Sequence, residues 1–131
     1  MEVQTGNRFQ IIDLTSQVEE ELRRSNVRDG ICLVYTPHTT TAVVVNEAEP
    51  GLLQDMLDKM RALVPESPHY RHGGDGNAHA HIQAALLGNS AVIPVERGSL
   101  LLGTWQRVLF LELDGPRRRR VMVKVLPGAG E

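Results

Sequence analysis

The chain is poor in aromatic side chains, cysteine and lysine, and these shortages exclude several classes of protein. Only 4% of its 131 residues are aromatic, so a folded core must be filled with Val, Leu, Ile and Ala. The single cysteine, Cys32, excludes an internal disulfide framework and makes a reducing cytoplasm the expected compartment. Cys32 stands in an apolar run, where a free thiol is expected to be inert core.

Long apolar runs and an excess of positive charge are also missing. No run approaches the roughly 20 apolar residues of a membrane span, and the first residues lack the basic and apolar regions of a secretory signal. The formal net charge is −2, whereas general nucleic-acid binders are basic because phosphate contacts dominate their affinity. We therefore expect neither a membrane nor a nucleic-acid partner. The length and the 41% hydrophobic content are typical of one globular domain, residues 1–131.

Turn signals and apolar periodicity predict three helices among many short strands. The helices are expected at residues 15–24, 52–63 and 78–87, and the first is expected to begin with a capping box of Ser16 and Glu19. The predicted strands are 9–14, 31–35, 39–45, 91–95, 100–102, 106–113 and 119–126. Helices mixed irregularly with hairpin-linked strands indicate an α+β fold.

Two of these strands are expected to be covered on both sides. Residues 31–35 are all apolar, which is typical of a strand buried on both faces. Residues 106–113 carry large apolar side chains on each face, including Phe110 on one and Leu111 on the other. A second sheet, a helix or another subunit is expected to cover the faces of strand 106–113.

Three of the five histidines lie where a structural role is not obvious. His38 follows a proline that interrupts a strand, His72 lies in a Gly-rich loop, and His81 is near the start of helix 78–87. Three imidazoles with an open position suit a catalytic Zn²⁺, although spacing alone also fits surface or capping histidines. His79 and His81 diverge by about 200° on a helix. Only one of the two is therefore expected at a common site, and they flank a predicted apolar stripe of Ala78, Ile82, Ala85 and Leu86.

Four consecutive arginines at 117–120 admit two interpretations. On a strand, Arg118 and Arg120 share one face, and guanidinium groups bind phosphate bidentately. Alternatively, the run is a solvated strand edge that discourages aggregation. Glu112 lies among apolar residues of the preceding strand, and a buried carboxylate there needs a partner such as Arg or protonated His.

Taken together, several segments resemble the YjbQ-like family, often described as secondary thiamine-phosphate synthases. The matching stretches are 36–42, 46–47, 70–72, 75–81, 86–88, 103–106 and 112–120, within a span from about 31 to 125. The resemblance implies a homotrimer of packed, mostly antiparallel, sandwich-like β-sheets with sites near the subunit interfaces. It implies catalytic roles for His38, His72, His81 and Glu112, with the three histidines as the ligands of a divalent metal. Ligand or phosphate contacts are expected from Thr39, Asn46, Trp105, Gln106, Arg118, Arg119 and Arg120.

The resemblance implies a transferase that joins a hydroxymethylpyrimidine diphosphate to a thiazole phosphate and releases pyrophosphate. Such a reaction needs Mg²⁺ or arginines to stabilise the leaving pyrophosphate. Three histidines suit Zn²⁺ better than Mg²⁺, which prefers oxygen ligands. Two alternatives stay open: a metal-dependent hydrolase of a small phosphorylated metabolite, and a non-catalytic trimeric module that binds a metal or a phosphorylated ligand.

Overall fold

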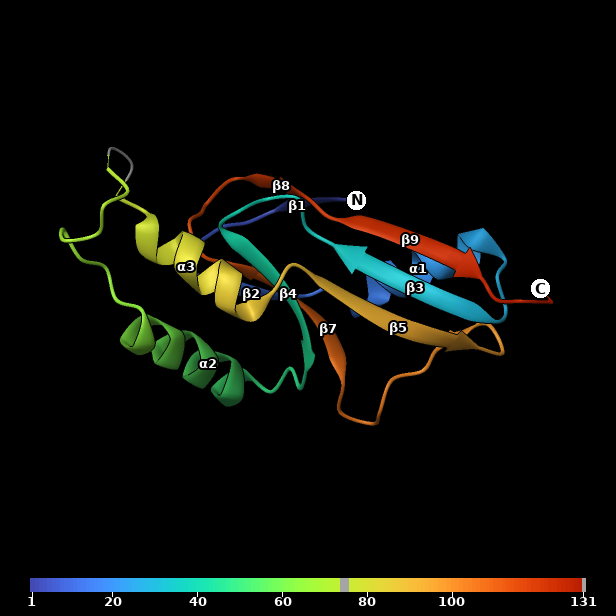
Figure 1. Cartoon of the computed structure of the whole chain (residues 1–131). Helices are drawn as coiled ribbons and strands as arrows, with labels where there is room; N and C mark the ends of the chain where they lie inside the picture. The colour runs from blue at the N-terminus through green and yellow to red at the C-terminus, as the bar shows by residue number, and fades with distance from the viewer. Residues whose placement is uncertain (74–75, 131) are drawn as a thin grey trace.

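Strands and helices alternate irregularly along the chain, as the sequence predicts (Figure 1). The computed structural model describes residues 1–73 and 76–130. The helices are α1 (Thr15–Ser25), α2 (Pro50–Leu63) and α3 (Ala78–Leu87). The strands are β1 (Glu2–Gln4), β2 (Gln10–Asp13), β3 (Gly30–Tyr35), β4 (Thr41–Asn46), β5 (Ser90–Glu96), β6 (Ser99–Leu100), β7 (Arg107–Glu112), β8 (Arg118–Arg120) and β9 (Met122–Pro127). Within the described ranges, no helix is both long enough and apolar enough to cross a membrane.

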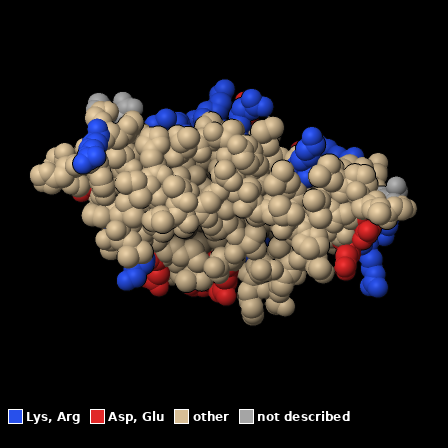
Figure 2. All heavy atoms as spheres, in the orientation of Figure 1, with Lys and Arg blue, Asp and Glu red and all other residues tan. Residues whose placement is uncertain are grey.

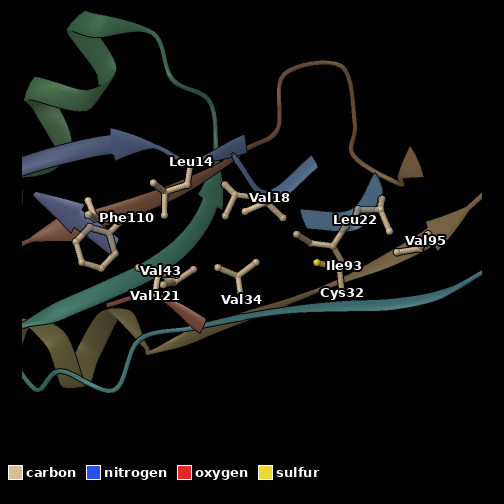
Figure 3. Packing of buried hydrophobic residues seen from close by; sticks show 12 residues of the cluster. Leu14, Val18, Leu22, Cys32, Val34, Val43, Ile93, Val95, Phe110 and Val121 are labelled. Carbon is tan, nitrogen blue, oxygen red and sulfur yellow. The ribbon is translucent and has the colours of Figure 1, made fainter. Parts of the chain in front are cut away.

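The strands form three antiparallel sheets, which confirms the predicted α+β fold. Their orders are β1-β8, β2-β7-β4 and β6-β5-β3-β9. The two larger sheets share a core with α1, in which Val34 of β3 lies with Val43 of β4 and Val18 of α1 (Figure 3). Aliphatic side chains dominate this core, and Phe110 is its one aromatic member among the described residues.

Strand β7 is covered on both faces, as predicted. Val108 and Phe110 belong to the core shared with α1, whereas Leu109 and Leu111 pack in a second core with α3. Small residues on α3, among them Ala84, let this helix lie close to the sheet. β7 therefore lies between two apolar layers and is the strand around which the chain folds.

Strand β3 departs from its prediction, because one chain buries only one of its faces. It is hydrogen-bonded on both edges, to β5 and β9, and its Cys32 and Val34 are fully buried against the layer that contains α1. The opposite face is open, and Ile31 remains 40% exposed. The all-apolar composition of residues 31–35 correctly indicated a strand with neighbours on both edges. It did not indicate that one chain leaves one of the two faces open. Burial raises the pKa of the Cys32 thiol to about 11, which is consistent with inert core.

The helices lie close to their predicted positions, but three details of them differ. The Ser16–Glu19 capping box does not form; the Asp13 carboxylate instead accepts a hydrogen bond from the Thr15 N–H (2.9 Å). The apolar stripe expected on α3 is wrong for three of its four residues, because only Ala78 of the four is buried. Ile82 and Leu86 are exposed there, while Ala80, Ala84, His79 and Gln83 are buried. Helix α2 begins two residues earlier than predicted, at Pro50, with Glu49 as its N-cap. It buries none of its side chains fully.

The arginine run belongs to a strand that the sequence did not separate. The predicted strand 119–126 is two strands in two sheets: β8 pairs with the unpredicted strand β1, and β9 pairs with β3. Between them, the buried Val121 turns inward and its N–H bonds to the carbonyl of Met1. This break places the arginines beside the start of β4 rather than in the large sheet.

Candidate functional site

A buried ion pair between Glu112 and Arg119 organises the predicted site. Glu112 is completely buried at the end of β7, and Arg119, in the middle of β8, is 3% exposed. Arg119 Nε donates to Glu112 Oε1 (2.8 Å), and Arg119 Nη2 donates to Oε2 (2.5 Å). The bidentate geometry fits two planar groups of opposite charge. The partner that the sequence required for a buried Glu112 is therefore an arginine.

Two threonines and a backbone amide complete the hydrogen bonding of this pair. Thr5 Oγ1 donates to Glu112 Oε1 (2.8 Å), and the N–H of Asp114 donates to Oε2 (3.1 Å). Arg119 also donates to Thr40 Oγ1 (2.9 Å), next to the start of β4. The pair thus joins β7, β8 and the segment before β4. Arg119 is occupied by these contacts, so the structure places it inside the protein rather than on a ligand surface.

The fixed β8 strand in turn holds His38. The backbone N–H of Arg120 donates to His38 Nε2 (2.9 Å). An Nε2 that accepts a hydrogen bond carries no proton, so the neutral ring carries its proton on Nδ1. The side chains of Arg118 and Arg120 are exposed beside this contact, whereas Arg119 points inward, as the alternation of a strand dictates.

His38 and His81 line one cavity of about 390 Å³, which we call the histidine groove. One wall is the turn between β3 and β4, with Thr39 beside His38, and the other is α3. His81 also borders a second hollow of about 380 Å³ lined by Tyr70 and His72. The His72 and His81 ring centroids are 5.0 Å apart at an interplanar angle of 70°. His81 therefore lies between the other two predicted histidines.

The remaining predicted site residues lie at the other end of the β4–β7 pair. Thr41 pairs with Glu112 at one end, which we call the histidine end, and Asn46 pairs with Arg107 at the other, the tryptophan end. Trp105 and Gln106 precede β7 there, and Trp105 is 71% exposed. At about 3.4 Å per residue, the two ends are roughly 17 Å apart. One chain therefore does not bring Trp105, Gln106 and Asn46 to the histidines.

Comparison with known proteins identifies the family of the chain. The profile described as UPF0047 protein YjbQ-like matches residues 1–128. The chain belongs to this family. A UPF0047 protein of Archaeoglobus fulgidus is 60% identical over 125 residues, covering 95% of this chain and 97% of the relative. The UPF0047 protein YugU of Bacillus subtilis is 36% identical over 127 residues, covering 96% of each chain.

Solved structures of YjbQ-like proteins share the fold. A YbjQ-like protein of unknown function from Sulfolobus solfataricus has a TM-score of 0.95 at 42% identity and covers 98% of this chain and 94% of its own. An uncharacterised YjbQ/UPF0047 protein from Clostridium acetobutylicum has a TM-score of 0.93 at 42% identity, covering 96% and 98%. These relatives establish the family and the fold, and the family is one of unknown function.

The expected metal is not matched by a complete ligand set in one YjbQ-like chain. Within residues 1–73 and 76–130, no group of three His, Cys, Asp or Glu side chains is arranged to hold an ion. The Nε2 lone pair of His38 is already used by Arg120, which leaves the neighbouring rings of His72 and His81. Asp75, the first residue of the matching stretch 75–81, lies outside the described residues. A metal at the three histidines therefore stays a prediction.

Two of the residues that build the site were missed by sequence reasoning. Thr5 and Thr40 hydrogen-bond to the buried ion pair, and both are buried. Thr40 lies inside the matching stretch 36–42, so its position was a usable signal. Thr5 belongs to an N-terminal segment with no distinguishing motif, and only the pairing of β1 with β8 brings it to Glu112.

Substitution of Glu112 by Gln should destabilise the fold strongly, because the Arg119 charge would stay buried without a counter-ion. We expect a loss of about 3–5 kcal/mol in the free energy of unfolding, measured by urea denaturation at one protein concentration. Arg117→Gln is the matched control. It removes the Arg117–Asp114 ion pair, whose arginine is 52% exposed, and should cost less than about 1 kcal/mol. Equal losses in the two variants are incompatible with an organising role for the buried pair.

The titration of His38 tests the hydrogen bond that its Nε2 accepts from the backbone N–H of Arg120. Burial lowers the pKa of His38 below its ordinary 6.5, and the nearby Arg119 charge lowers it further. Below pH 6.5 the unfolded chain therefore binds more protons at this position, so stability should be full above that pH and decline as pH falls. His38→Gln should remove part of this decline, because the pKa of His79 is lowered as well. NMR of the imidazole nitrogens should show His38 neutral with its proton on Nδ1; a midpoint above 6.5 or a proton on Nε2 refutes the arrangement.

Proposed function

We propose that this YjbQ-like protein is a homotrimer that binds a small phosphorylated metabolite between neighbouring copies. The exposed guanidinium groups of Arg118 and Arg120, held beside His38 by the buried Glu112–Arg119 pair, carry this proposal. Two guanidinium groups on one face of a strand are well suited to phosphate oxygens. Figure 2 shows basic side chains along the edge of the molecule where β8 lies.

The separation of the two ends of the β4–β7 pair supports a site shared between copies. Trp105, Gln106 and Asn46 at the tryptophan end are roughly 17 Å from the histidine end within one chain. In a closed ring of identical subunits, different surface patches of neighbouring copies meet at every interface. The tryptophan end of one copy can then complete the histidine end of the next.

An open apolar sheet face supports the self-association. The uncovered face of β5, β3 and β9 exposes Val92 (59%), Met122 (49%), Leu126 (41%) and Ile31 (40%). Figure 2 shows this face almost free of charged atoms, with Lys, Arg, Asp and Glu at its rim. Lys124 also lies on this face, on its outer strand β9, and the apolar side chains around it form a surface typical of protein interfaces. A second copy would also supply the cover that the all-apolar composition of residues 31–35 predicts.

The chemistry that this site supports best is transfer from a diphosphate ester. In the thiamine-phosphate synthase type of reaction, the thiazole nitrogen forms a bond to the pyrimidine methylene carbon. The carbon–oxygen bond breaks at the same carbon, and its electron pair leaves with pyrophosphate. Arg118 and Arg120 would neutralise that leaving group, and the Nδ1–H of His38 would donate to a ligand oxygen. A metal at His72 and His81 would add Lewis acidity to the same end of the site.

Two alternatives use the same residues. A metal-dependent hydrolase would release phosphate from a phosphorylated metabolite, and a non-catalytic module would hold such a ligand unchanged. The neighbouring His72 and His81 rings favour the first, whereas the complete burial of Glu112 removes one predicted catalytic carboxylate from the surface and favours the second. Metal analysis of the purified protein and product analysis after incubation separate these possibilities.

Val92→Glu should break the proposed assembly, because it places a charge at the centre of the open apolar face. Sedimentation equilibrium should give three times the 14.5 kDa of one chain for the unmodified protein and a smaller mass for the variant. Gln17→Glu, on the exposed side of α1, adds the same charge elsewhere and should leave the mass unchanged. An unmodified protein that sediments as a monomer contradicts both the trimer and the shared site.

Calorimetric titration with 4-methyl-5-(2-hydroxyethyl)thiazole phosphate tests the ligand proposal. Arg118→Gln and Arg120→Gln should each raise the Kd about tenfold or more, because each removes a charge-assisted hydrogen bond. Arg24→Gln, an exposed arginine at the end of α1, is the matched control and should bind like the unmodified protein. Affinity that does not change in the Arg118 and Arg120 variants rules out phosphate binding at β8. With the pyrimidine diphosphate added, release of pyrophosphate identifies the transferase, and binding without product identifies the module.

A further inference from the structure

A second polar pocket lies on the other side of α3 from the histidine groove. It has a volume of about 640 Å³, within the range of small-molecule sites. We call it the arginine pocket; its lining includes Arg8, Phe9, Arg61, Glu66, His79 and Gln83. His79 and His81 are two positions apart on α3 and therefore point about 200° apart. The helix thus separates this pocket from the site described above.

Two buried side chains present unpaired polar atoms at this pocket. His79 is 2% exposed, and its Nε2 has no hydrogen-bond partner among the described residues. Gln83 is fully buried; its Nε2 donates to the carbonyl of Val64 (3.0 Å) and lies 3.4 Å from that of Met60. Because these carbonyls fix the amide, its unpaired atom is the acceptor Oε1. Buried polar atoms are normally paired, so unpaired ones at a cavity indicate a missing partner.

Positive charge stands at the same cavity. The guanidinium carbon of Arg61 lies 4.7 Å from the centroid of the Phe9 ring, and that of Arg8 lies 5.8 Å from it. Arg8 is paired with Glu66, whose Oε1 is also 3.5 Å from His79 Nε2. Arg61 makes no ion pair with a described carboxylate, although Asp58 lines the pocket too. Arg61 is therefore the cation of this pocket that is available to pair with an anion.

We propose that the arginine pocket is a second binding site, for a small anion that also carries a hydroxyl group. The anionic group would bind Arg61, with Arg8 adding charge. The hydroxyl would donate to Gln83 Oε1 and a further oxygen would reach His79 Nε2. An amine could also donate to Gln83, and the carboxylates of Asp58 and Glu66 line the pocket as well. An anion is favoured because Arg8 already neutralises Glu66, whereas Arg61 lies over the Phe9 ring and pairs with no described carboxylate. An organic anion is the class that fits, because it carries both a charged group for Arg61 and a hydroxyl for the unpaired Gln83 Oε1.

The test is an NMR titration that follows the ring nitrogens of His79. Glycerol 3-phosphate is the probe, because it combines an anion with hydroxyl groups; glycerol and inorganic phosphate each supply one half. We expect saturable shifts at His79 with glycerol 3-phosphate and at least tenfold weaker effects with either half alone. Arg61→Gln, at an exposed position in the last turn of α2, should weaken binding at least tenfold.

Two controls separate this site from others. Arg24→Gln removes an equivalent arginine from the last turn of α1 and should leave the titration unchanged. His38→Asn alters the histidine groove and should also leave the His79 shifts unchanged. The proposal is overturned if glycerol 3-phosphate at about 10 mM, ten times a weak Kd of roughly 1 mM, leaves His79 unshifted. It is equally overturned if Arg61→Gln binds as tightly as the unmodified protein, or if His38→Asn abolishes the shifts.

Discussion

The buried ion pair between Glu112 and Arg119 is the interaction on which the candidate site depends. A carboxylate without exposure at the end of the central strand must be neutralised where it stands, and Arg119 of β8 does so with two hydrogen bonds. This requirement fixes β8, and strand alternation then turns Arg118 and Arg120 outward. The backbone of Arg120 meets His38. One buried charge thus determines where the exposed cations and a neutral imidazole lie.

Much of the fold could be predicted because its signals are local. The apolar faces of β7 and the bounds of α3, residues 78–87, were predicted from the sequence and are present in the structure. The covered face of α3 was not predictable, because small Ala80 and Ala84, rather than Ile82 and Leu86, allow close packing on the sheet. The division of β8 from β9 depends on pairing with β1 and β3, which are distant in sequence.

In the candidate site too, requirements set by neighbouring residues could be predicted, whereas contacts between residues distant in sequence could not. The need of Glu112 for a cationic partner followed from its apolar neighbours, but only the folded chain shows that Arg119, and not a histidine, supplies it. His79, set aside on sequence grounds, is buried beside a second pocket. The opposite placement of His38 and Trp105 follows from the antiparallel register of β4 and β7. Register is a tertiary property, so residues that look like one site in the sequence occupy two ends of one chain.

A shared site between copies is the central claim, and subunit mixing tests it most directly. Arg120→Glu damages the histidine end and Trp105→Ala the tryptophan end, so neither variant alone should bind thiazole phosphate. When equal amounts are unfolded together and refolded, a site is intact where an undamaged histidine end meets the undamaged tryptophan end of its neighbour. Random assembly then restores about one quarter of the sites. Recovery of about a quarter is the result that the account predicts, and the absence of any recovery would show that each site is built within one chain.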